Sequence, residues 1–229
     1  MIGIIFAMKE ELNAFIQELK VINTYKIFDL VFYEVEFLDK KLILVESGIG
    51  KVNAARTTQI LIDNMKIDYL FNVGVAGGIS HELNVLDIVI ADSLVQHDFD
   101  ITEFNHPKGY IPNVGISIKC DEYLIKIATE VASKLNLKVK SGVIASGDIF
   151  VSNLTMSDKI NKKFKAIATE MEGASIAQVA YLSNIPFLVI RSISDVVGTN
   201  NKITYESFLE ESSREVANFL KNILKEINL

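Results

Sequence analysis

The chain has 229 residues, of which 49% are hydrophobic and 23% charged, and its formal net charge is −6. This composition is typical of a globular protein with a large core, most simply one domain spanning 1–229. The negative charge disfavours a nucleic-acid or anionic-membrane binder, because no basic face is in excess.

Cysteine content and hydropathy narrow the class further. Cys120 is the only cysteine, which excludes a disulfide framework or a cysteine-based zinc site within one chain. The apolar start at 1–6 is too short for a signal peptide and runs into charged residues. No apolar run reaches membrane-spanning length, so we expect no membrane association and a cytoplasmic location.

Apolar runs and helical periods alternate along the first half of the chain. The sequence predicts, in order, a buried strand at 2–6, a helix with its apolar stripe at 12–19, a hairpin of 30–38 and 41–45 turning at Asp39-Lys40, a helix from about 51, and strands at 69–75 and 85–91. An irregular segment, 97–114, follows. It is too long for a simple connector, so we expect a functional or interface loop.

The second half continues the alternation. The sequence predicts a helix at 122–135, a strand at 139–145, a helix from about Glu170 to Ser183, a strand at 186–193 and a long last helix capped by Thr204. Strands alternating with helices predict an α/β fold with a largely parallel sheet, which the hairpin makes mixed.

Polar or glycine-rich stretches follow several predicted strands, where ligands bind in open α/β sheets. They are Ala7-Met8-Lys9-Glu10-Glu11, Ser47-Gly48-Ile49-Gly50, Gly74-Val75-Ala76-Gly77-Gly78, Ser146-Gly147-Asp148 and Ser194-Asp195. None is a dinucleotide or P-loop fingerprint, because the third glycine of G-x-G-x-x-G is missing and no G-x-x-x-x-G-K-[ST] occurs.

Two carboxyl groups fall where burial is expected. Asp195 ends an apolar strand, and its apolar neighbours should raise its pKa, which suits a general acid; the alternative is a cap or turn residue. Glu172 falls at the head of a helical stripe with Ile176 and Val179. Its alternative is a first-turn acid facing the positive end of the helix dipole.

Other candidate sites are weaker. The spacing of His97, Asp98, Asp100 and His106 matches no metal-ligand pattern, so turn or interface roles are favoured. A serine hydrolase is disfavoured because no G-x-S-x-G elbow is present. Cys120 lacks a histidine partner and is expected to pack in a half-buried position.

Six motifs, taken together in this order, resemble a known family. They are Ile2-Gly3-Ile4-Ile5 with Ala7-Met8-x-Glu10-Glu11, Ser47-Gly48-Ile49-Gly50-Lys51-Val52, Gly74-x-Ala76-Gly77-Gly78, Ser146-Gly147-Asp148-x-Phe150, Glu170-Met171-Glu172, and Arg191-x-Ile193-Ser194-Asp195. They span nearly the whole chain. The combination is similar to the 5′-methylthioadenosine/S-adenosylhomocysteine nucleosidases of the purine nucleoside phosphorylase superfamily.

The resemblance implies a nucleoside phosphorylase-like fold, three-layer α/β/α around a central mixed, largely parallel sheet. It also implies hydrolysis of the N-glycosidic bond of methylthioadenosine and adenosylhomocysteine to adenine and a thioribose, in methionine salvage and methyl-cycle recycling. No metal or cofactor is implied. Within the family, 5′-deoxyadenosine and 6-amino-6-deoxyfutalosine are further candidate substrates.

The resemblance also assigns roles to the reacting groups. Asp195, helped by Ser194, would protonate adenine N7. Glu11 would orient or activate the attacking water, with Arg191 nearby, and Glu172 would hold the ribose hydroxyls.

The remaining positions would bind the substrate. Phe150 would stack on adenine, the backbone of Val151 would read its edge, and Met171 would pack beside the sugar. Phe104 and Pro112 would reach the alkylthio pocket of a neighbouring subunit, which implies a homodimer. Further substrate-binding positions implied by the motifs are Ala7, Met8, Ile49 and Gly77.

One position departs from the family pattern, and other functions remain as alternatives. Val75 stands where many relatives have Ser, so a hydroxyl that could help to place the water is absent. The main alternative is a purine nucleoside phosphorylase. It is disfavoured because the loop after the first strand is acidic where phosphate would need positive charge. A nucleoside-binding module or a purely structural protein would leave the three carboxyl groups unexplained.

Overall fold

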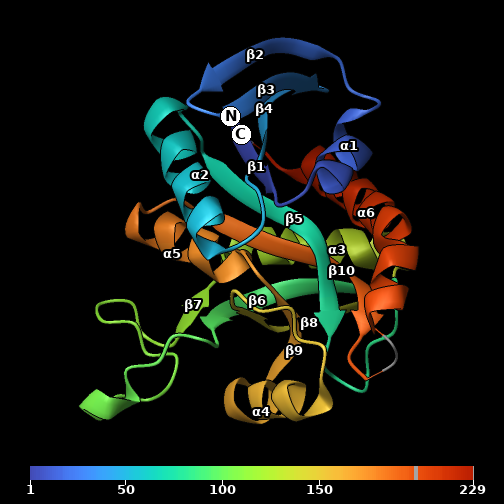
Figure 1. Ribbon diagram of the computed structural model, residues 1–229. Coiled ribbons are helices and arrows are strands. Elements are labelled where there is room, and N and C mark those ends of the chain that lie inside the picture. The colour runs from blue at the N-terminus through green and yellow to red at the C-terminus, as the bar shows by residue number, and fades with distance from the viewer. Residues whose placement is uncertain (199–200, 229) are drawn as a thin grey trace.

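The computed structural model describes residues 1–198 and 201–228 and has an α/β fold (Figure 1). Its strands are β1 (Ile2–Phe6), β2 (Val21–Ile27), β3 (Leu30–Phe37), β4 (Lys40–Glu46), β5 (Tyr69–Gly78), β6 (Ile88–Gln96), β7 (Ser117–Lys119), β8 (Val139–Ser146), β9 (Ala166–Glu170) and β10 (Phe187–Val196). Its helices are α1 (Lys9–Ile16), α2 (Lys51–Asn64), α3 (Glu122–Lys134), α4 (Leu154–Phe164), α5 (Gly173–Leu182) and α6 (Asn201–Glu226).

The strands form one mixed sheet in the order β10-β6-β8-β9-β5-β1-β4-β3-β2, with β7 paired to β6. Because β10 also pairs with β5, part of the sheet closes on itself through β5, β10, β6, β8 and β9. Strand β1 runs parallel to β4 and β5, and β10 runs parallel to β5. The carboxyl ends of these four strands therefore meet at one edge of the sheet.

Helices cover the two faces of the sheet. Helix α2 packs with α5 on one face, while α1 and α3 contact α6 on the other (Figure 1). Strand β1 is buried along its whole length, as are nine of the ten residues of β10. Such doubly covered strands are apolar until their carboxyl ends, where the first polar residues appear.

The structure corrects several predicted boundaries. The helix expected from Glu170 begins at Gly173, because Glu170 is the last residue of β9 and Glu172 is the residue before the helix. Thr204 does not cap the last helix but lies within α6. The strand expected at 85–91 is β6, shifted towards Gln96, and the turn of the hairpin comes before Lys40. Strands β2, β7 and β9 and helix α4 were not predicted.

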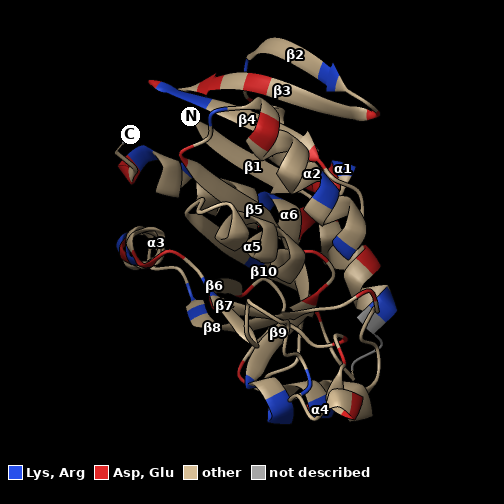
Figure 2. Ribbon diagram, turned by 90° about the vertical axis from the view of Figure 1, so that its left-hand side faces the viewer, with Lys and Arg blue, Asp and Glu red and all other residues tan. Residues whose placement is uncertain are grey.

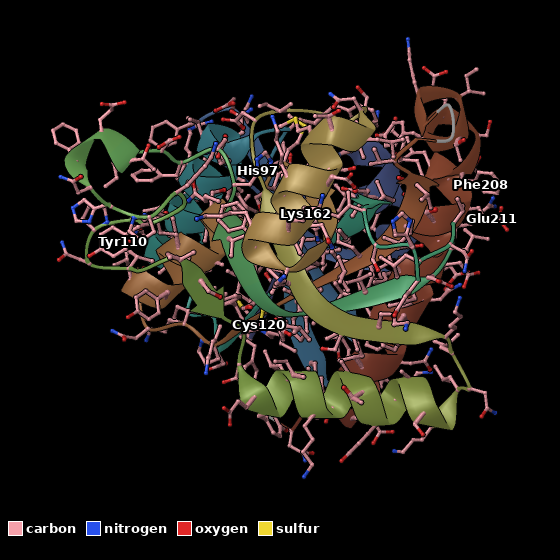
Figure 3. All side chains as sticks on the ribbon, turned by 90° about the horizontal axis from the view of Figure 1, so that it is seen from below. His97, Tyr110, Cys120, Lys162, Phe208 and Glu211 are labelled. Carbon is pink, nitrogen blue, oxygen red and sulfur yellow. The ribbon has the colours of Figure 1, made fainter. Side chains whose placement is uncertain are left out.

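The irregular segment after β6 contains one short 3-10 turn, η1 (Thr102–Phe104). Figure 3 shows this segment standing out from the body of the molecule, with His97 at its root and Tyr110 near its far side. Basic and acidic residues are interleaved over the ribbon (Figure 2). In 1–198 and 201–228, no helix is both long and apolar enough to cross a membrane.

Candidate functional site

A cavity of about 340 Å³ lies at the carboxyl edge of the sheet. Ten positions singled out from the sequence line it: Ala7, Met8, Glu11, Ile49, Gly77, Phe150, Met171, Glu172, Ser194 and Asp195. Most of its surface is apolar, with carboxyl groups as its main polar features, and its size suits a small organic ligand.

Glu11 is held by backbone amides at the start of α1. One of its carboxylate oxygens, Oε2, accepts hydrogen bonds from the amides of Ala7 (2.9 Å) and Met8 (3.1 Å). Its other oxygen, Oε1, accepts from the amide of Val75 (3.0 Å) on β5. Burial raises the pKa of Glu11 although the Arg191 charge and these amides oppose the shift. A carboxylate with a raised pKa is a stronger base than one in water.

Glu172 comes directly before α5, and its side chain turns back to the cavity. Its Oε1 accepts a hydrogen bond of 2.7 Å from the amide of Gly50. Gly50 has a φ of +99°, a backbone conformation that favours glycine. Burial, followed by the negative charge of Glu170, raises the pKa of Glu172 to about 8. This carboxyl therefore holds a proton at neutral pH more firmly than a glutamate in water does.

Asp195 lies at the end of β10, where the pairing with β5 is irregular. The register shifts between Ile193 and Asp195, which brings Asp195 opposite Gly77. The hydroxyl of Ser194 donates to Asp195 Oδ1 at 2.9 Å. A Cβ atom on Gly77 would lie 3.4 Å from Asp195 Oδ2, so glycine keeps the approach to this carboxyl open.

A buried ion pair joins Glu170 in the cavity wall to Arg191 behind it. Arg191 donates to Glu170 Oε2 at 2.6 Å and to the carbonyl of Asn72 at 3.1 Å, and it also bonds the Asn72 side chain. The same Glu170 oxygen accepts from the amides of Glu172 (3.1 Å) and Gly173 (2.7 Å), and Oε1 accepts from the Ser146 hydroxyl. From the sequence, Glu172 could be an acid facing the positive end of a helix dipole. In the structure this description fits Glu170, whose carboxylate faces the start of α5.

Comparison with known proteins identifies the family. The phosphorylase superfamily model matches residues 1–227. The 5′-methylthioadenosine/S-adenosylhomocysteine nucleosidase of Bacillus licheniformis is 40% identical and aligns over 99% of both chains. The chain belongs to the 5′-methylthioadenosine/S-adenosylhomocysteine nucleosidase family.

Solved structures agree with this nucleosidase assignment. The Streptococcus pyogenes S-adenosylhomocysteine nucleosidase, in complex with 5-methylthiotubericidin, has a TM-score of 0.95 and 35% identity, covering 100% of this chain and 97% of that one. The futalosine hydrolase of Helicobacter pylori has a TM-score of 0.96 and 37% identity, covering 99% and 97%. The α/β fold and the mixed sheet expected from the family are therefore confirmed.

Sequence reasoning missed one conspicuous residue of this nucleosidase cavity. Tyr205, near the start of α6, lines the cavity, donates a hydrogen bond of 3.2 Å to the Met8 sulfur and meets the Phe150 ring edge-on at 5.8 Å. Burial and nearby acidic groups raise its pKa to about 12, so the hydroxyl stays neutral. Its only sequence signal was an aromatic residue early in the last helix. The other lining residues are Val75, Ala76, Thr169 and Glu170.

Four predicted site residues do not line the cavity. Arg191 is buried behind it, as described above. Val151 is buried in a small apolar cluster with Val95 and Ile160. Phe104 and Pro112 lie in the projecting segment and are exposed, Phe104 by 75%. No three His, Cys, Asp or Glu side chains converge as metal ligands would within the described part of the chain.

Proposed function

We propose that this chain hydrolyses the N-glycosidic bond of 5′-methylthioadenosine and S-adenosylhomocysteine, releasing adenine and the thioribose product. The observation that carries the proposal is the convergence of three buried carboxyl groups, those of Glu11, Glu172 and Asp195, on one cavity. Breaking a glycosidic C–N bond needs a protonated leaving group and a water on the opposite face of a cationic sugar.

Asp195 is the proposed general acid. Its proton passes to N7 of adenine as the C–N bond breaks, so that the base leaves neutral. Ser194 holds Asp195 Oδ1 through a hydrogen bond of 2.9 Å and so fixes which oxygen faces the leaving group. Loss of this proton donor should affect the bond-breaking step more than binding.

Glu11 is the proposed base for water, and Glu172 the proposed partner of the ribose hydroxyls. Three amides orient Glu11 from two elements, so its carboxylate can position a water without a hydroxyl at Val75. Arg191 lies behind the cavity wall and contributes its charge to Glu11. A carboxylate at the sugar also stabilises the positive charge that develops there.

The apolar walls suit the rest of the substrate. We propose that Phe150 stacks on adenine while the Val151 backbone meets its edge, and that Met171 packs beside the sugar. Ala7, Met8, Ile49 and Gly77 complete the wall. A thioether makes no hydrogen-bonding demand, so it needs only apolar surroundings.

The charge of the cavity favours hydrolysis over phosphorolysis. Among the described residues, no lysine or arginine lines the cavity. Arg56 pairs with Asp29 at the surface, and Arg191 is paired with Glu170. Phosphate would therefore meet carboxyl groups without a cationic partner.

The test is a substrate panel with purified protein, assayed for adenine with and without phosphate. It includes methylthioadenosine, adenosylhomocysteine, 5′-deoxyadenosine and 6-amino-6-deoxyfutalosine, the last because a futalosine hydrolase is among the similar structures. We expect phosphate-independent adenine release. A requirement for phosphate, with a sugar 1-phosphate as product, would establish the phosphorylase alternative.

Asp195→Asn tests the proposed acid. We expect turnover to be lost while affinity for a 7-deaza-adenine nucleoside, which offers no N7 to protonate, is largely kept. Unchanged turnover would remove Asp195 from this role.

The wider biological setting is also part of the proposal. We propose one nucleosidase domain over 1–229, a cytoplasmic homodimer, and a place in methionine salvage and methyl-cycle recycling. The exposed Phe104 and Pro112 support the dimer, because apolar side chains on a projecting segment gain from a partner surface.

A further inference from the structure

Three loops around the cavity are joined by a cluster that the proposed mechanism does not use. Lys51 Nζ donates to Asp98 Oδ1 at 2.7 Å, and the Asp148 amide donates to Asp98 Oδ2 at 3.0 Å. The Lys51 amide donates to Asp148 Oδ1 at 2.8 Å. These contacts close a ring through the loops that follow β4, β6 and β8. We call Lys51, Asp98 and Asp148 the loop clamp.

The ion pair of the loop clamp is largely buried. The side chains of Lys51 and Asp98 are only 18% and 20% exposed. Burial disfavours ionisation of Asp98, but the Lys51 and Asp148 hydrogen bonds outweigh it and hold its pKa below the usual value. Lys51 Nζ also donates to Gln96, whose amide donates to Gln178 on α5. Solvent and salt screen an ion pair shielded in this way less than an exposed one.

Each clamped loop carries part of the proposed site. Gly50, beside Lys51, donates its amide to Glu172. Phe150 follows Asp148 by two residues, and Ile49 and Phe150 both line the cavity although each is about half exposed. Asp98 follows His97 at the beginning of the projecting segment. The clamp therefore fixes the Phe150 wall relative to the Glu172 wall.

We propose that Lys51 and Asp98 are positioning residues for substrate binding, which hold the adenine-stacking wall and the ribose-binding wall at a fixed separation. This inference rests on the proposed function of the cavity. Glu11 and Asp195 take no part in the clamp. Breaking it should therefore weaken binding of the nucleoside much more than it slows the chemical step.

A second ion pair, at the starts of β6 and β8, provides the control. Lys138 Nζ donates to Asp87 Oδ2 at 2.8 Å, and these residues directly precede β8 and β6. This pair thus joins the starts of the two strands whose ends lead into the clamp, away from the cavity. Lys138→Met removes an ion pair of similar length, in which the lysine is 57% exposed, without touching the clamped loops.

The experiment measures KM and kcat for methylthioadenosine, and the melting temperature, in Lys51→Met and Lys138→Met. We expect Lys51→Met to raise KM about tenfold with a much smaller change in kcat, and Lys138→Met to change neither. Lys51→Arg, which keeps the charge, should restore most of the affinity. The proposal is wrong if both methionine variants change KM equally, or if Lys51→Met lowers only kcat.

Two further variants guard against loss of folding. Asp98→Asn should also raise KM, and the double variant should be no worse than Lys51→Met alone because both changes break the Lys51–Asp98 ion pair. Calorimetric titration with the 7-deaza-adenine nucleoside separates this inference from the proposed function. If the wild type binds this ligand but does not cleave methylthioadenosine, the proposed function is wrong. The clamp is then tested by comparing Kd values in place of KM values. Equal Kd values for the wild type and Lys51→Met would refute the clamp.

Discussion

Gly74 lies against the proposed base and limits what this position in β5 can hold. A Cβ atom there would come within 2.3 Å of Glu11 Oε1. Three amides fix that carboxylate, so it cannot move aside without losing hydrogen bonds. Gly74→Ala should therefore cost about 1–3 kcal/mol of unfolding free energy and lower kcat.

A double-mutant cycle in urea locates the cause of that cost. In a Glu11→Ala background the added methyl group has room, so Gly74→Ala should cost much less there. An equal cost in both backgrounds would mean that the strain arises elsewhere in β5.

The proton on Glu172 gives ligand binding a pH dependence. Ribose hydroxyls that donate to this carboxyl favour its ionised form, so binding lowers its pKa from about 8. At pH 7 the complex should then release a proton, and affinity should rise as the pH rises towards 8. Calorimetric titrations of the 7-deaza-adenine nucleoside in buffers of different ionisation enthalpy measure this release.

The matched control is Glu172→Gln, which cannot titrate. It should release fewer protons and should lose more affinity for the ribonucleoside than for its 2′-deoxy analogue. Without ligand, the same group affects stability. The pKa of Glu172 in the folded protein lies above its ordinary value of 4.5, so the folded state binds the extra proton, and this group's contribution to stability falls as the pH rises from 4.5 to 8. Identical proton release in both proteins would contradict the assignment.

At the scale of elements, Glu170 joins β9, α5 and β10. It satisfies two amides at the start of α5 and neutralises the buried Arg191. Glu170→Gln removes the carboxylate that pairs directly with the buried arginine, so we expect a loss of about 3–5 kcal/mol of unfolding free energy.

An ordinary helix cap provides the comparison for Glu170. Asp121 caps α3 by accepting the Leu124 amide at 3.0 Å. Asp121→Ala should cost only about 1 kcal/mol in the same urea experiment. Similar costs for the two variants would show that Glu170 acts as a cap and not as a counter-ion.

The sequence predicted the strands whose residues are apolar on both faces and the turns rich in glycine, because those patterns are local. It put Glu11 and Asp195 at one edge because the carboxyl ends of parallel strands share an edge. Glu172 was assigned to the same site by the family resemblance and not by a local pattern. It misplaced the start of α5 because Glu170 belongs to β9, whose pairing with β8 and β5 is a long-range contact. Tyr205 was missed for a similar reason, since only the packing of α6 brings it to Met8.

At the scale of the whole molecule, the projecting segment predicts a site shared between two subunits. Phe104 is exposed and does not line the cavity of its own chain, although the family resemblance implies a role in substrate binding. If Phe104 contacts the substrate bound by the neighbouring subunit, a Phe104→Ala homodimer should have a raised KM although both of its subunits keep Asp195. Light scattering of the wild type should first give the mass of a dimer.

Mixed dimers show whether Phe104 contacts substrate bound by the neighbouring subunit or substrate bound by its own chain. One subunit carries Phe104→Ala and the other Asp195→Asn, with different tags so that the heterodimer can be purified. If Phe104 crosses the interface, the subunit that keeps Asp195 receives an intact Phe104 from its partner. The heterodimer should then show the wild-type KM and about half the wild-type kcat per dimer, because only one of its two sites retains the acid. If Phe104 serves its own chain, the same heterodimer should keep the raised KM of the Phe104→Ala homodimer.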